Sequence, residues 1–152
     1  MYIQGIFDNF RKELEAAQRA EGIILTLGEL LEKLQGSTYS KPVFFKRLDD
    51  DREFILDLDD PFFSYRGYYE RMALGITNSI DTLIPTVGHV IQTLENALDE
   101  GTMEGYKGGD YSINKNVLMY AEWDYSSCNG MMINNVAEED NRVLILLKIE
   151  QF

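Results

Sequence analysis

The amino-acid sequence predicts an α+β fold in which two or three helices pack on an antiparallel or mixed β-sheet. The chain has 152 residues, of which 45% are hydrophobic and 26% charged, as in ordinary globular proteins. Several segments have the apolar spacing of amphipathic helices, and the last third has apolar runs typical of strands. Since no linker or low-complexity stretch divides the chain, we expect a single domain over 1–152, with 1–22 as a helical extension of a 23–152 core.

The first expected helix runs from about residue 8 to 20. Phe10, Leu14 and Ala17 recur at helical spacing and form its apolar stripe. The opposite face is polar and includes Gln18, so we expect that face in solvent.

Two further helices are expected to begin at threonine N-caps. Glu29 follows Thr26 by three positions and completes a capping box, and Gly36 ends this helix. A second helix is expected over 86–100, after Pro85. The segments TLGELLEKL and TVGHVIQTL share their Thr, Gly and last Leu. This repeat has two interpretations: duplication of a helix–strand unit, or chance similarity between two capped amphipathic helices.

Strands are expected wherever short apolar runs lie between turn residues. Phe54, Leu56 and Leu58 alternate with polar residues, as in a strand with one buried face. The polar stretch AEEDNR between two apolar runs predicts a terminal hairpin. The expected strands are 42–46, 53–58, 117–120, 131–136 and 143–149.

Charge and cysteine content narrow the function classes. The net charge is −12 and the pI about 4.4, which opposes binding to a nucleic-acid polymer through its phosphates. One cysteine, Cys128, and one histidine, His89, exclude a disulfide framework and a thiolate or imidazole metal site within one chain. The acids of 49–60 admit a cation site, but turn charges explain them better. We therefore expect no metal and no cofactor.

The sequence favours a cytoplasmic protein that does not enter a membrane. The N-terminus lacks a basic region followed by a clean apolar stretch, so a secretory signal is not expected. The apolar run 143–147 is far shorter than the roughly 20 residues of a spanning helix.

Two segments carry the residue types of an anion-binding site. The first, DDPFFSYRGYYERMAL, combines arginines, which bind phosphate in bidentate fashion, with tyrosines that stack on bases. The second, EGYKGGDYSINKN, has glycines that can expose backbone N–H groups beside a lysine. No Lys or Arg occurs between Met72 and Tyr106, so an anion site must use the flanking cations. The expected ligand-binding residues are Tyr65, Arg66, Tyr68, Tyr69, Arg71, Lys107, Gly108 and Gly109.

The order of these motifs resembles a family of small proteins of tailed phages. The resemblance covers about residues 25–150 and rests on TLGELLEKL…KPVFF, SYRGYYERMAL, a Thr-x-Gly helix and EGYKGGDY. Met72 departs from the usual leucine. The family has no established reaction, so the resemblance implies an accessory protein in the cytoplasm of the infected bacterium and transfers no catalytic residue.

Three functions remain open on these grounds. The chain is expected to bind and sequester a small phosphorylated or nucleotide-like host ligand, as a counter-defence protein. An acidic inhibitor of a host defence protein is the alternative. A nucleotide-processing enzyme that uses Asp59, Asp60 or Asp110 is the third and has the least support. We also expect a homo-oligomer, because 9 Tyr and 8 Phe are many for so small a domain to bury.

Overall fold

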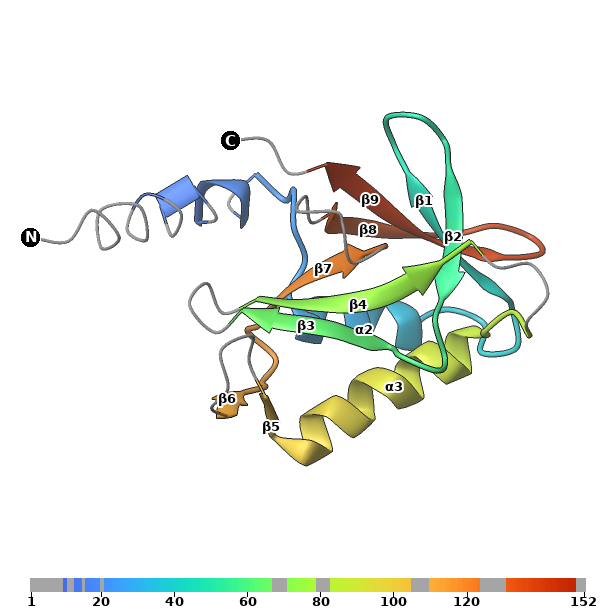
Figure 1. Cartoon of the computed structure of the whole chain (residues 1–152). Helices are drawn as coiled ribbons and strands as arrows, with labels where there is room; N and C mark the ends of the chain where they lie inside the picture. The colour runs from blue at the N-terminus through green and yellow to red at the C-terminus, as the bar shows by residue number, and fades with distance from the viewer. Residues whose placement is uncertain are drawn as a thin grey trace, which may run out of the picture.

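The strands close into a six-stranded β-barrel (Figure 1), so the expected α+β sheet covered by helices is wrong. This is a computed structural model. It describes residues 10, 13–14, 16–19, 21–66, 71–78, 83–104, 110–123 and 131–149, and within these it leaves the side chains of 62–66, 71, 103–104 and 110–111 undescribed. The named elements are α2 (Leu27–Gln35), β1 (Val43–Arg47), β2 (Glu53–Leu56), β3 (Phe62–Arg66), β4 (Arg71–Thr77), α3 (Val87–Glu100), β5 (Thr102–Glu104), β6 (Asp110–Ser112), β7 (Leu118–Glu122), β8 (Met131–Glu138) and β9 (Val143–Ile149).

The barrel closes because its sheet returns to its own first strand. The strand order is β2-β1-β9-β8-β7-β4, and β4 then pairs with β2. Two of these pairings, β1 with β9 and β4 with β7, are parallel and join distant parts of the chain. Sequence periodicity identifies a strand but not its partner, so closure was missed although β1, β2, β7, β8 and β9 were expected near their observed positions.

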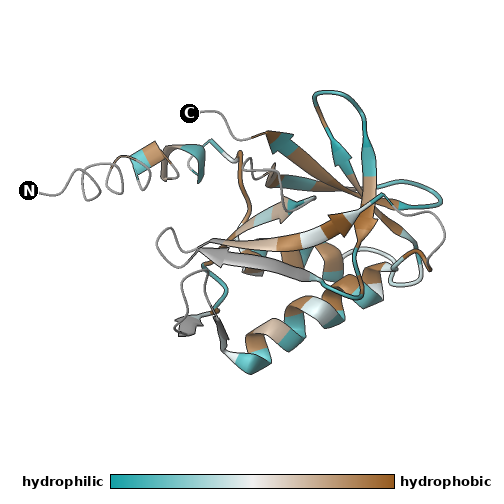
Figure 2. Cartoon of the chain, viewed as in Figure 1, coloured by the Kyte–Doolittle hydropathy of each residue, from teal (hydrophilic) through white to brown (hydrophobic). Residues whose placement is uncertain are grey.

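Both later helices form where their caps predict. Thr26 caps α2 through a capping box with Glu29, and Thr86 caps α3 through the same arrangement with His89. Gly101 ends α3 with φ 73°, a left-handed conformation that favours glycine. Apolar side chains of both helices join the barrel interior in one core, and Figure 2 shows hydrophobic colour along the strands and in bands along α3. The helices begin beside the first residues of β7 and β1, at one end of the barrel.

The two halves of the chain use the same hydrogen bonds to attach their helices. The first and second residues of each helix donate backbone hydrogen bonds to the segment that leads into the first strand after the other helix. These four bonds run from Leu27 to Val117 (2.8 Å), from Val87 to Lys41 (2.9 Å), from Gly28 to Lys115 (3.0 Å) and from Gly88 to Tyr39 (3.0 Å). Each half therefore holds the other half's helix in an equivalent way.

The strands repeat the same register in both halves. In the parallel pairings Val43 lies opposite Val143, and Met119 lies opposite Met72. In the antiparallel pairings, the equivalent pairs are Leu56 with Ile76 and Ile133 with Leu147. Chance similarity between two helices predicts no common register in the strands, so the register supports the duplication interpretation. The repeated units are α2-β1-β2-β4 and α3-β7-β8-β9.

Among the described residues, the two halves differ by three additions. The β5–β6 hairpin is inserted between α3 and β7, and residues 57–61 interrupt the strand that β2 and β3 form against β4. The third addition is the N-terminal helical segment, blue in Figure 1, which runs outward from the barrel.

The burial of the N-terminal segment is opposite to the expectation. Gln18 is buried, whereas Phe10 is 57% exposed and Ala17 is exposed. Gln18 is buried because the segment that follows it folds back against the outside of the barrel. There Ile24 packs in a second apolar cluster with Ala73, Leu118, Tyr120 and Met132.

Candidate functional site

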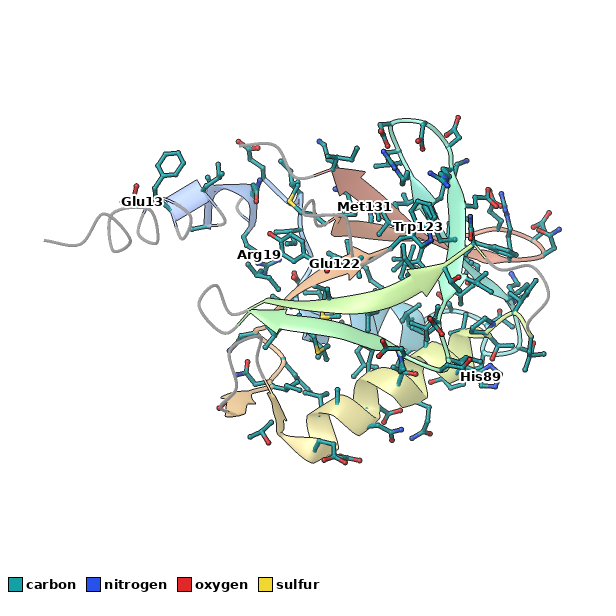
Figure 3. The ribbon with its side chains drawn as sticks, viewed as in Figure 1. Glu13, Arg19, His89, Glu122, Trp123 and Met131 are labelled. Carbon is teal, nitrogen blue, oxygen red and sulfur yellow. The ribbon has the colours of Figure 1, made fainter. Side chains whose placement is uncertain are left out.

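A cation stacked on two aromatic rings lies at the barrel end opposite the helices. The guanidinium carbon of Arg52 is 4.3 Å from the ring centre of Trp123 and 5.3 Å from that of Phe54. The two rings are themselves in contact, with centroids 5.4 Å apart and a tilt of 46°. We call these three residues the Arg52 cluster. Figure 3 labels Trp123 near the arrowhead of β4, where β4 and β7 finish.

Each member of the Arg52 cluster is positioned by the barrel. Phe54 points into the core from β2 and is 1% exposed, and Trp123 packs against the same core directly after β7. The β1–β2 turn positions Arg52, whose carbonyl accepts the Arg47 N–H at 2.8 Å. Asp51 gives the turn its bend with a positive φ of 60°. The rings are therefore a rigid support for a solvent-facing cation.

The acids nearest Arg52 in sequence pair with other cations. Arg47 donates two hydrogen bonds to Asp49, at 2.9 and 3.1 Å, and these bonds lower the pKa of that carboxyl group. Asp51 lies 3.7 Å from Lys46, and the Asp50 carboxylate accepts the backbone N–H of Arg52. Across the described ranges, no carboxylate forms an ion pair with the Arg52 guanidinium.

This arrangement is suited to binding an oxyanion. A guanidinium that lies on an aromatic ring keeps its in-plane N–H donors available, and their fork matches a carboxylate or phosphate. Stacking also reduces the side-chain entropy that binding would otherwise remove. In a chain of net charge −12, a cation that has no ion pair among the described residues is an uncommon feature. The Arg52 cluster can bind an anion but supplies no nucleophile or base.

The residues predicted to bind a ligand are only partly within the described structure. Arg66 ends β3 and Arg71 begins β4, and the register places them directly opposite each other. Opposed like charges are unfavourable in a sheet unless a counter-ion lies near them. Tyr65 lies opposite the buried Met72. The other predicted residues, Tyr68, Tyr69, Lys107, Gly108 and Gly109, fall outside the described residues, so the pocket stays a prediction.

The Arg52 cluster was missed because its members are far apart in the sequence. Trp123 packs against the main core. Arg52 belongs to no recognisable sequence motif. The β1–β2 turn reaches the end of β7 only because the barrel closes. β1 and β7 are equivalent strands of the repeated halves, so the contact between Arg52, which lies after β1, and Trp123, which lies directly after β7, joins the halves.

The remaining candidates have structural roles. Asp57 accepts the backbone N–H groups of Asp59 and Asp60, at 3.0 and 3.3 Å, as a turn residue does. The Nδ1 of His89 accepts the Thr86 N–H at 3.0 Å, which makes His89 a helix cap. Cys128 is outside the described ranges. In the part of the chain that is described, no three His, Cys, Asp or Glu side chains gather as a metal site.

No family model, curated protein or solved structure matches this chain. Among the described residues, no helix combines the length and apolar character needed to cross a membrane.

Proposed function

We propose that the protein binds a small anionic ligand, phosphorylated or nucleotide-like, and acts by sequestering it. The observation that carries this proposal is the Arg52 guanidinium stacked at 4.3 Å on Trp123 without an ion-pair partner in the described structure. The resemblance to small tailed-phage proteins adds the setting of an accessory protein in the infected bacterium, where sequestering a host signal would serve counter-defence. Sequestration needs a site and no catalytic group, in keeping with the residues of the Arg52 cluster.

The opposed positions of Arg66 and Arg71 give additional support. They lie at the start of β4, whereas the Arg52 cluster lies beyond its end. A ligand with two separated anionic groups could contact both the Arg66–Arg71 pair and the Arg52 cluster. The proposal itself rests on the Arg52 cluster alone.

The test uses the single tryptophan of the chain, Trp123, as a fluorescent reporter. Phosphate, pyrophosphate, and linear and cyclic nucleotides are titrated into the wild type and into Arg52→Ala. A charge-assisted contact of about 1.5–3 kcal/mol corresponds to a tenfold to hundredfold loss of affinity in the variant. Arg52→Lys keeps the charge but loses the planar fork, so it should recover part of the affinity.

Lys33→Ala is the matched control. Lys33 is an exposed cation on α2, at the opposite end of the barrel from the Arg52 cluster. It should bind like the wild type. If no anion changes the fluorescence or the heat of titration, or if Arg52→Ala binds as tightly as the wild type, the proposal fails. A loss in Arg66→Ala alone would move the site to the pocket expected from the sequence.

A second function, inhibition of a basic host protein, is favoured by one observation on α3. This helix contains no Lys or Arg, and its exposed face carries Glu95, Asp99 and Glu100. Asp99 and Glu100 lie at the C-terminal end, where negative charge is unfavourable for the helix dipole. If Asp99→Asn/Glu100→Gln stabilises the protein while weakening capture of a host protein, the inhibitor function gains. No comparable observation favours the enzyme.

A further inference from the structure

The internal repeat reveals two equivalent apolar patches on the outside of the barrel that differ in exposure. In the first half Ile23 and Ile24 precede the capping Thr26, and in the second half Leu83 and Ile84 precede the capping Thr86. The equivalence is fixed by hydrogen bonds, because the Leu25 carbonyl accepts from Met119 and the Pro85 carbonyl from Val43 (3.0 and 2.9 Å).

The first patch is covered by the chain's own N-terminal segment. Ile24 is fully buried, and its carbonyl accepts a hydrogen bond from Arg19 at 2.7 Å. Arg19 also pairs with Glu29 at the start of α2. The Ile23 N–H donates to the carbonyl of the buried Gln18 at 2.8 Å. The end of the N-terminal helix is therefore anchored over this patch.

The second patch lacks this cover. Leu83 is 70% and Ile84 38% exposed, although their equivalents are half-buried and buried. The Pro42–Thr86 bridge continues into the bond from Val43 to Pro85, and this antiparallel register places Ile84 opposite the half-buried Phe44. The Arg142 guanidinium carbon lies 5.6 Å from the centre of the Phe44 ring. Phe44, Leu83 and Ile84 together form the second patch.

The N-terminal helix offers a matching apolar residue that its own barrel does not cover. Phe10 is 57% exposed on the helix that runs outward in Figure 1, and Glu13, on the same helix, is labelled away from the barrel in Figure 3. We infer that two copies of the chain associate, and that the Phe10 side of each N-terminal helix covers the second patch of the other copy. The same kind of segment then covers the equivalent patch in both halves, and the reciprocal exchange closes a two-fold dimer.

The first test is the mass in solution, measured by light scattering over a wide range of concentration. The wild type should be a dimer, and Phe10→Asp and Leu83→Asp should each raise the dimer dissociation constant by about tenfold or more, as expected when an interface anchor is lost. Leu58→Asp is the control, since Leu58 is 44% exposed in the turn before β3 and should leave the dimer unchanged. Circular dichroism of each variant checks that the fold is retained.

The second test identifies the occupant. Phe10→Cys and Leu83→Cys are combined in a Cys128→Ser background and oxidised, and a disulfide-linked dimer is expected. A disulfide within one chain would show that the helix folds onto its own barrel and would overturn the proposal. A monomeric wild type would also overturn the proposal. So would a dimer that dissociates in Leu83→Asp but not in Phe10→Asp, because the second patches of the two copies would then pair with each other. These outcomes do not depend on anion binding, so this inference and the proposed function can fail separately.

Discussion

Gly28 and Gly88 occupy equivalent positions near the starts of α2 and α3 but have different surroundings. A Cβ at residue 28 would lie 2.9 Å from the Cβ and 3.2 Å from the carbonyl oxygen of Lys115, whereas one at residue 88 would meet the Tyr39 carbonyl at 3.6 Å. We expect Gly28→Ala to lose roughly 1–3 kcal/mol of unfolding free energy through overpacking. Gly88→Ala should be neutral or gain up to about 1 kcal/mol from helix propensity. Urea denaturation measures both, and equal effects would contradict the difference in packing.

A surface carboxyl group should contribute to the acid sensitivity of the protein. Hydrogen bonds from Lys41 and Thr38 lower the pKa of Glu138 from 4.5 to about 2. Because the folded-state pKa is lowered, its stabilising contribution is present above the unfolded pKa and is lost as the pH falls toward 2. Glu138→Gln should therefore be less stable than the wild type at pH 7, and the gap should close between about pH 5 and 2. A gap that stays constant over this range would show that the charge of Glu138 is not responsible.

At the scale of the element, local signals predicted the helices well. The threonine caps, the glycine stops and the apolar stripes act within one segment, so α2 and α3 formed as expected, and β9 has the expected bounds 143–149. The N-terminal helix shows the limit of such reasoning. Its apolar stripe and polar face were assigned from spacing alone, but tertiary packing buried Gln18 and left Phe10 exposed.

The repeat also suggests how to strengthen α3. His89 fills the capping-box position that Glu29 fills in α2. A glutamate accepts the same backbone N–H and adds negative charge at the helix N-terminus. His89→Glu should therefore raise the free energy of unfolding by about 0.5–1 kcal/mol. Thermal unfolding measures the gain, with His89→Ala as a control that should lose stability.

At the scale of the whole molecule, closure could not be predicted because it depends on pairings between the halves. β1 pairs with β9, and β4 with β7, and nothing in either segment specifies the partner. The Arg52 cluster depends on the same closure, because Arg52 and Trp123 meet only when the two halves interlock. The anion site expected from the sequence motifs stays a prediction, whereas the Arg52 cluster could be recognised only once the strand pairings were known.

Interlocking predicts that neither half folds alone. The first and last strands of each repeat unit use parallel partners from the other unit, so each isolated half would expose unpaired edges and half a core. We expect chains 1–78 and 83–152 to be unfolded separately and to regain β-structure when mixed. Circular dichroism and native mass spectrometry measure this complementation. A stable, folded single half would contradict the role given to the parallel pairs.

The pairing of β1 with β9 also determines when the protein can fold during synthesis. β1 is translated long before its parallel partner β9, because Val43 pairs with Val143. Until then the nascent chain carries an unpaired strand and apolar surface that chaperones can recognise. Loop closure over such a separation slows folding, so the barrel should close only after β9 has been translated. A ribosome that stalls before β9 would therefore release an aggregation-prone chain instead of a smaller working domain.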